Sequence, residues 1–150
     1  MNVLYISYDG ILEPLGQSQV LSYLEGLTNE RVIHLISFEN PADKKNQCLY
    51  SKVSQRIEKA NIQWHPLTYH KQPTAIATLW DIFRAIILGL WLVLRFKLRI
   101  IHARSYVSSV AALVIKKLLG TYYIFDMRGF WVDERVDGEI WSRDSYLYRI

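Results

Sequence analysis

Short apolar runs and longer stretches with helical spacing alternate along most of the chain. Runs rich in β-branched and aromatic residues, each bounded by turn-forming residues, predict buried strands. The first of these runs ends at Asp9-Gly10, which is a strong turn signal. The predicted strands span residues 3–8, 31–38, 62–69, 100–103 and 122–126.

The stretches between these strands predict helices. One helix follows Gly16, and the next is expected to begin at Asn40-Pro41, where Asn40 can cap the first turn. Further helices are predicted over residues 79–96 and 107–119, with Gly120 as a stop signal, and a last helical pattern begins at Asp144. The apolar positions of the first two helices are Val20, Leu21, Leu24, Leu27, Leu49, Val53 and Ile57.

Strands joined by helical crossovers imply an α/β fold. Five such strands predict a Rossmann-like parallel sheet with helices on both faces. The length of 150 residues is that of one typical domain. Because the chain ends inside the helical pattern that begins at Asp144, we expect one domain over residues 1–150 that is truncated at its C-terminus.

A modest positive charge adds candidate partners to this picture. The formal net charge is +4, and basic residues gather at residues 44–45, 95–99 and 116–117. This surplus suits anionic partners such as nucleotide diphosphates or acidic lipid headgroups, although most of these lysines are expected to lie on ordinary solvated helix faces.

One apolar run bears on membrane contact. Residues 85–94 carry no charge, but they are about half as many as a membrane span requires. We interpret the run as a buried or interfacial helix. The cationic Arg95, Lys97 and Arg99 beside it permit peripheral contact with a membrane surface.

Several classes of site are excluded or disfavoured. Cys48 is the only cysteine, so an internal disulfide and a cysteine-based zinc cluster cannot form; we expect it half-buried on a helix. The histidines lie on different elements without metal-binding spacing, and no metal is expected. The N-terminus lacks the basic and apolar regions of a signal peptide, so a cytoplasmic location is expected.

Ligands of parallel sheets bind beyond the carboxyl ends of the strands. The loop after the first predicted strand contains Asp9, Gly10 and Gly16. Gly10 allows a turn that a side chain would forbid, and Gly16 lets the backbone approach an anion at a helix start. Both glycines can equally serve the turn alone.

A dinucleotide-dependent dehydrogenase is a poor interpretation of this loop. Gly10 and Gly16 are too far apart for the compact Gly-x-Gly-x-x-Gly spacing. Glu39 ends the second strand, where an acidic residue can grip a ribose, but this match counts for little without the glycines.

The segment after the fourth predicted strand offers a titratable and a cationic side chain. His102 can hydrogen-bond a sugar hydroxyl or act on a proton near neutral pH, although an isolated histidine can also be structural. Arg104 can clamp a phosphate or a carboxylate. Ser105 is placed to cap the following helix.

The loop after the fifth predicted strand gathers charges, aromatic rings and a glycine. Aromatic faces suit sugar rings, and carboxylates suit sugar hydroxyls. The competing interpretation is an ion-pair network in which Asp126 or Asp133 braces the loop by pairing with Arg128 or Arg135. The candidate residues are Asp126, Arg128, Gly129, Trp131, Asp133 and Glu134.

Three blocks of sequence resemble the N-terminal domain of family 4 glycosyltransferases. They occur in the order expected for the family and together span essentially the whole chain. The blocks are Ser7 to Gly10 with Leu15 to Leu21, then Ile101 to Tyr106, and then Asp126 to Trp131.

This resemblance implies one half of a GT-B architecture, in which two Rossmann-like domains enclose the active site. Such enzymes are generally metal-independent and retain the anomeric configuration of the sugar. In the family, the first loop of the N-terminal domain reaches the donor diphosphate, which matches Gly16 and Gln17, and a histidine near the transferred sugar matches His102. The nucleotide pocket and a pair of glutamates belong to the C-terminal domain, for which 150 residues leave no room.

The resulting hypothesis is the acceptor-side domain of an enzyme that moves a sugar from a nucleotide-sugar to a glycan or lipid-linked acceptor. No cofactor and no nucleic-acid partner are expected. The alternative is a non-catalytic binding or assembly module that needs a partner chain, and such a partner can also supply the second domain. The expected acceptor-side residues are Asp9, Gly10, Arg104, Ser105, Asp126, Arg128, Gly129, Trp131, Asp133 and Glu134.

Overall fold

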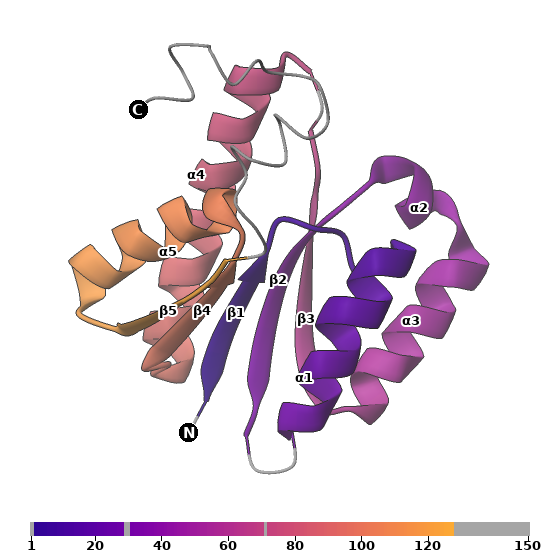
Figure 1. Cartoon of the computed structure of the whole chain (residues 1–150), viewed down its shortest axis with the longest axis horizontal. Helices are drawn as coiled ribbons and strands as arrows, with labels where there is room; N and C mark the ends of the chain where they lie inside the picture. Colours follow the sequence, from indigo (N-terminus) through magenta and orange to yellow (C-terminus); the bar gives the residue numbers. More distant parts are fainter. Residues whose placement is uncertain (1, 29–30, 71, 128–150) are drawn as a thin grey trace, which may run out of the picture.

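The computed structural model describes residues 2–28, 31–70 and 72–127, which form a five-stranded sheet (Figure 1). Its spatial order is β3-β2-β1-β4-β5, and every neighbouring pair is parallel. The predicted α/β fold with a Rossmann-like parallel sheet is therefore confirmed. The strands are β1 Val3–Ser7, β2 Ile33–Glu39, β3 Ile62–Thr68, β4 Ile100–Arg104 and β5 Tyr122–Asp126.

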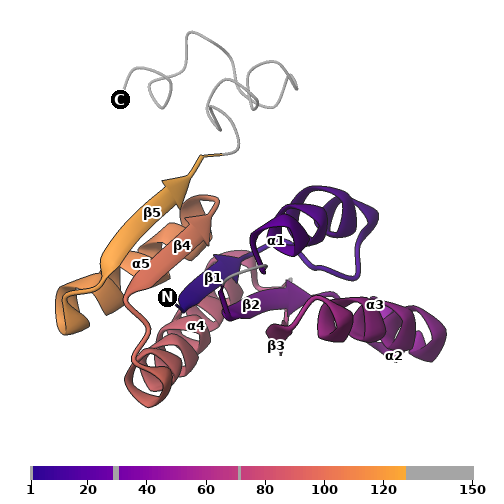
Figure 2. The same ribbon diagram turned by 90° about the horizontal axis from the view of Figure 1, so that it is seen from below.

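Helices cover both faces of this sheet, as right-handed crossovers from a central first strand require (Figure 2). On one face, α1 and α3 pack against β1, β2 and β3; on the other, α4 and α5 pack against β1, β2 and β4. The helical segments are η1 Gly16–Leu21 (a π-helical turn), α1 Ser22–Leu27, α2 Pro41–Lys45, α3 Gln47–Lys59, α4 Thr74–Phe96 and α5 Tyr106–Leu119.

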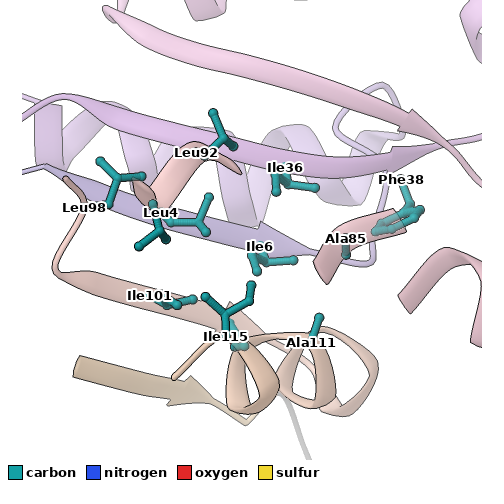
Figure 3. Packing of buried hydrophobic residues seen from close by; sticks show 13 residues of the cluster. Leu4, Ile6, Ile36, Phe38, Ala85, Leu92, Leu98, Ile101, Ala111 and Ile115 are labelled. Atoms are coloured by element: carbon teal, nitrogen blue, oxygen red, sulfur yellow. The ribbon is translucent and has the colours of Figure 1, made fainter. Parts of the chain in front are cut away.

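Each face has its own apolar core, because alternate residues of a strand point to opposite sides. Leu4 and Ile6 of β1 face α4 and α5, where they meet Leu92 and Ile115 (Figure 3). Tyr5 of β1 faces the opposite side and joins the core beneath α1 and α3. The central strand thus anchors both layers, and its last residues lead directly into the loop that carries the candidate site.

The predicted helix from Asn40 is two helices in the structure. Asn40 does cap the first one, accepting a hydrogen bond from the backbone of Ala42, but Asn46 has extended ψ and ends it. The Asn46 side chain then accepts from the backbone N–H of Leu49 and starts α3. A second capping residue inside a continuous apolar pattern explains the break.

Other local predictions have mixed outcomes. Gly120 ends α5 with a left-handed φ of 67°, which confirms the predicted stop. The helix between β3 and β4, which is α4, begins at Thr74 and not at the predicted residue 79. Its N-cap residue is Pro73. Cys48 is exposed, so its expected half-buried place is wrong. The pattern from Asp144 lies outside the described residues.

Candidate functional site

The candidate site lies beyond the carboxyl ends of β1 and β4, which are neighbours in the sheet. The connection from β1 runs through α1 on one face, and the connection from β4 runs through α5 on the other, so a crevice opens beyond their carboxyl ends. The parallel register sets Ser7 of β1 beside Arg104 of β4, and Arg104 beside Asp126 of β5. Three predicted strand-end segments therefore share one edge of the sheet.

Arg104 is the centre of a polar network at this edge. Its Nη1 lies 3.2 Å from Asp126 Oδ2, and its Nη2 donates to Gln19 Oε1 at 2.6 Å. The Nε atom is buried, makes no hydrogen bond among the described atoms, and lies 3.6 Å from Asp9 Oδ2. One guanidinium thus holds together the ends of β4 and β5, the first loop and the first helical turns.

His102 lies two residues before Arg104 on the same face of β4, and aromatic rings surround it. Its ring centroid is 4.6 Å from that of Tyr5 and 6.1 Å from that of Tyr23, while its Nε2 is 4.0 Å from Asp126 Oδ2. Burial lowers the pKa of His102, with Asp126 opposing and Arg104 reinforcing this effect. The imidazole is therefore favoured in its neutral form, which can accept a proton or a hydroxyl hydrogen bond.

Tyr5, which lies beside His102 on the neighbouring strand, keeps its proton. Burial, followed by the nearby Asp126 carboxylate, raises the pKa of the Tyr5 phenol well above its usual range. Its hydroxyl lies 3.5 Å from Asp126 Oδ2. The floor of the site is therefore a neutral phenol and a neutral imidazole rather than a pair of charges.

A hollow of about 450 Å³ opens over these groups and is lined by Gln19, Tyr23, His102, Arg104, Phe125 and Asp126. A smaller cavity of about 160 Å³ continues down the same sheet face. Tyr23 and His102 line both spaces, and the smaller one is otherwise mainly apolar. The site therefore combines a polar rim with an aromatic and aliphatic floor, which is the usual anatomy of a small-molecule pocket.

The charge balance of the rim favours a hydroxyl-rich ligand over a free anion. Asp9 and Asp126 both lie within 3.6 Å of the Arg104 guanidinium, so its positive charge is already compensated. Carboxylates accept hydrogen bonds from hydroxyl groups and repel phosphates. Arg104 here orients acceptors rather than presenting an open anion clamp.

The loop after β1 is shaped by Glu39, which is completely buried at the end of β2. Its two carboxylate oxygens accept hydrogen bonds from the backbone N–H groups of Ile11 and Leu12, each at 2.9 Å. Ser37 Oγ donates to the same carboxylate at 2.5 Å. Glu39 therefore holds the loop in place. This structural role explains why an acidic residue ends β2, and no ribose ligand is needed to explain it.

Packing requires a glycine at position 16 and leaves little space for a side chain at position 10. A Cβ at Gly16 would lie 1.9 Å from the carbonyl oxygen of Gly10, and a Cβ at Gly10 would lie 3.0 Å from a carboxylate oxygen of Glu39. Gly10 does not have a positive φ. The expectation that Gly10 serves a side-chain-forbidding turn is thus corrected: the reason is lack of space.

Gln17 is largely engaged inside the same loop. Its backbone N–H donates to the carbonyl of Glu13, and its side-chain Nε2 donates to the carbonyl of Leu12, both at 3.0 Å. Gly16 is buried. These contacts place both residues behind the rim, and a role in binding a diphosphate remains a prediction for them.

Ser105 does not cap α5 with its side chain, which corrects the prediction. It occupies the cap position with a φ of 76°, and its buried Oγ has no hydrogen-bond partner among the described residues. Instead its backbone N–H donates to the carbonyl of Asp126, and its carbonyl accepts from Ser109. A strained backbone thus links the ends of β4 and β5 beneath the site.

The structure adds residues that the motifs did not single out. Gln19 and Tyr23 are one helical turn apart, so both project from the first helical segment toward β4. Tyr5 pairs in register with His102 on the neighbouring strand. The helical spacing of the first pair was readable, but their partner strand was not. The predicted residues Arg128, Gly129, Trp131, Asp133 and Glu134, and Arg135 as a pairing partner, lie outside the described residues.

Histidines from different elements do meet elsewhere in the fold. His34 Nδ1 of β2 lies 3.3 Å from His65 Nε2 of β3, on the face that carries α4. Within the described part of the chain, no group of three His, Cys, Asp or Glu side chains is placed to hold a metal ion.

Comparison with known proteins supports the fold alone. Neither a protein-family model nor a curated protein sequence matches the chain. The teicoplanin deacetylase Orf2, in its zinc-inhibited form, superposes with a TM-score of 0.52 at 9% identity, over 82% of this chain and 66% of its own. The C-terminal domain of a Pyrococcus furiosus hydrogenase gives 0.48 at 15% identity, over 83% and 89%.

A mutant of ferredoxin-NADP+ reductase from Plasmodium falciparum, in complex with 2'P-AMP, gives a TM-score of 0.43 at 16% identity. The match covers 83% of this chain and 53% of the reductase chain. All three identities are low, and the sheet with helices on both faces is what the chain shares with the deacetylase.

Proposed function

We propose that this chain is the acceptor-side domain of a retaining glycosyltransferase, of the kind that its sequence blocks resemble. One observation supports this best: Asp9, His102, Arg104 and Asp126 lie close together around one hollow, beyond the carboxyl ends of β1 and β4. Two of the three resembling blocks thus meet at one edge of the sheet, and the third begins there at Asp126.

In this proposal, the site's chemistry is recognition of sugar hydroxyls. Asp9 and Asp126 accept hydrogen bonds from hydroxyl groups, and Arg104 fixes both carboxylates in place. The Tyr23 ring offers an apolar face at the mouth of the hollow. Neutral His102 contacts the transferred sugar or accepts a hydroxyl proton.

The donor nucleotide is proposed to bind mainly to a second domain, as in the family that the sequence resembles. The compensated charge of Arg104 agrees with this division, because the rim offers little free positive charge to a diphosphate. The intact enzyme would pass a sugar to a glycan or a lipid-linked acceptor, with Gly16 and Gln17 near the diphosphate.

Isotope-detected NMR titration of the chain tests this proposal. Short oligosaccharides should shift the signals of Tyr23, His102 and Asp126 with millimolar affinity, and nucleotide-sugars should bind more weakly or not at all. The variant Arg104→Met should abolish the oligosaccharide shifts, whereas Arg56→Met on α3 should leave them unchanged. Micromolar binding of a nucleotide-sugar, or shifts confined to residues outside the hollow, would contradict the proposal.

A second candidate, a non-catalytic assembly module, is favoured by the exposed surface of β5. Tyr122 is 72% exposed and Ile124 is 47% exposed on the sheet face that α1 leaves uncovered. Sequencing the neighbouring reading frames separates the two ideas. A second Rossmann pattern with two spaced glutamates would favour the transferase, and an unrelated co-purifying partner that covers β5 would favour assembly.

A further inference from the structure

The outer face of α4 is a continuous apolar stripe. Its large side chains recur every three or four residues along about five turns, and each is between 51% and 68% exposed. The members are Ile76, Leu79, Trp80, Phe83, Ile87, Trp91 and Leu94. The opposite side of the same helix is buried against the sheet and α5 through Ala85 and Leu92. The helix is therefore apolar on both sides, and among the described residues only its inner side is covered.

This stripe extends onto α5, which packs beside α4 on the same sheet face (Figure 2). Val110 and Leu113 are 47% and 42% exposed, and Lys117 follows them one turn later. We call the combined surface, made of the seven α4 residues with Val110 and Leu113, the outer helical face. Apolar residues that are exposed singly are normal on a soluble protein, but here nine of them form one surface.

The charges around the outer helical face are almost all positive. From residue 72 to residue 125 the sequence contains a single acidic residue, Asp81, against seven Lys and Arg residues. Asp81 is fully buried, where its carboxylate contacts His70 at 2.6 Å and Tyr8 at 3.3 Å. Exposed cationic residues gather at the C-terminal ends of α4 and α5: Arg95, Lys97, Arg99, Lys116 and Lys117.

We propose that the outer helical face docks on the surface of an anionic lipid bilayer. Indole rings concentrate at the boundary between lipid headgroups and hydrocarbon, and Trp80 and Trp91 stand at that level on one helix face. A helix with an apolar stripe and flanking cations binds in the plane of the interface. The surplus of cations then pairs with lipid phosphates.

A transmembrane crossing of α4 explains the structure less well. Residues Ala75–Phe96 are long and apolar enough to span a bilayer by length and composition. The buried side of the helix is nevertheless part of the core, through Ala85, Leu92 and Val93, and it carries the buried Asp81. Withdrawing the helix would expose that core and strip Asp81 of its hydrogen bonds, so the helix lies on the bilayer instead.

A second copy of the chain is also a weaker occupant. However two outer helical faces are paired, Arg95, Arg99 and Lys117 would find no exposed acidic side chain within residues 72–125 of the other copy, because that segment contains only the buried Asp81. An anionic bilayer satisfies both the apolar and the cationic parts of the surface. The proposal does not depend on sugar transfer.

Vesicle sedimentation of the chain tests the docking. The chain should sediment with vesicles of phosphatidylcholine mixed with phosphatidylglycerol, should bind pure phosphatidylcholine at least about tenfold more weakly, and should be released by high salt. The variant Trp80→Ser/Trp91→Ser should reduce binding at least about tenfold while its thermal unfolding stays cooperative, because both rings project from the fold.

A matched pair of charge variants separates docking from net charge. Arg95→Glu/Arg99→Glu/Lys117→Glu should abolish binding to the anionic vesicles. Lys45→Glu/Lys52→Glu/Lys59→Glu changes the net charge equally on exposed positions of α2 and α3, and should retain binding within about threefold of the parent's.

Three outcomes would overturn the proposal. One is a chain that binds neither kind of vesicle, and another is an equal loss of binding in both charge variants. The third is a chain that self-associates in sedimentation velocity, ignores vesicles, and becomes monomeric in Trp80→Ser/Trp91→Ser; that result would assign the outer helical face to a second copy.

Discussion

Gly16 shows how the identity of a single residue determines the shape of the first loop. The space where its side chain would stand is filled by the carbonyl of Gly10. A backbone atom cannot move aside as the end of a flexible side chain can, so the loop must shift to admit even a methyl group. Gly26, exposed on α1, has open space at the same position.

Replacing each of these glycines with alanine should therefore have opposite effects. Gly16→Ala should lower the free energy of unfolding by about 2 kcal/mol or more, because of overpacking. Gly26→Ala should raise it by about 0.5–1 kcal/mol through better helix propensity. Urea unfolding monitored by circular dichroism measures both. A Gly16→Ala variant as stable as the parent would show that the loop has more room than the structure gives it.

Residue-level predictions from the sequence succeeded where the signal is local. The Asn40 cap and the Gly120 stop depend on a few neighbouring backbone groups, and both are present. The expected places of Ser105 and Cys48 were wrong, and the role of Glu39 in the first loop was not predicted, because all three depend on how distant segments pack. A buried carboxylate that braces a loop from the neighbouring strand cannot be recognised without strand order.

At the scale of elements, β2, β3 and α4 meet at a pair of histidines. The rings of His34 and His65 are stacked with centroids 5.5 Å apart, and His34 also lies against Phe96 at 4.3 Å. Burial lowers the pKa of both imidazoles; for His65 the neighbouring His34 adds to the effect, and the pKa falls from 6.5 to about 4. Both rings are therefore neutral in the folded chain near neutral pH.

This pair should make the fold sensitive to mild acid. The unfolded chain takes up protons near pH 6.5 and the folded chain only near pH 4, so stability is lost as the pH falls through that window. In His65→Gln the loss should be smaller. The difference in free energy of unfolding between parent and variant should shift in favour of the variant from pH 7 to pH 4.

Denaturant titrations of both proteins at several pH values measure this difference. Protonation of carboxylates affects parent and variant alike and cancels in the comparison. Curves that stay parallel from pH 7 to pH 4 would mean that His65 is not desolvated in the folded chain.

Element types were predictable from periodicity, and their ends were less so. All five strands appear where apolar runs predicted them. The break at Asn46 was missed because the apolar spacing of the helix continues across it. The first residues of α4, from Thr74 to Thr78, were missed although Ile76 already follows the apolar spacing of the helix.

At the scale of the whole molecule, protection against solvent should fall from the centre of the sheet to its β5 edge. β1 is paired on both sides, and its Leu4, Tyr5 and Ile6 are almost completely buried. β5 pairs with β4 alone within the described residues, and Tyr122 is 72% exposed.

Amide hydrogen exchange should therefore be slowest in β1 and at least about tenfold faster in β5, since peripheral elements open locally at less cost. The measurement is residue-resolved exchange by NMR. Equal protection of the two strands would indicate that β5 is covered in solution, and would favour the assembly alternative.

The candidate site was partly predictable at this scale. The rule that ligands lie beyond parallel strand ends placed Asp9, His102, Arg104 and Asp126 at one edge, and the geometry brings them together. Gln19, Tyr5 and Tyr23 were not predicted as site residues, because their contribution depends on which strand lies under the first helix. Strand order is a property of the complete sheet and cannot be predicted from any single segment of the sequence.

The brace that Glu39 provides has a consequence for how any ligand is met. Two consecutive peptide groups of the first loop are already fixed by a carboxylate from the adjoining strand. The rim is thus rigid before a ligand arrives, and little chain entropy remains to be lost on binding. Encounter should then be a single-step event, whose rate rises in proportion to ligand concentration without a plateau from loop rearrangement.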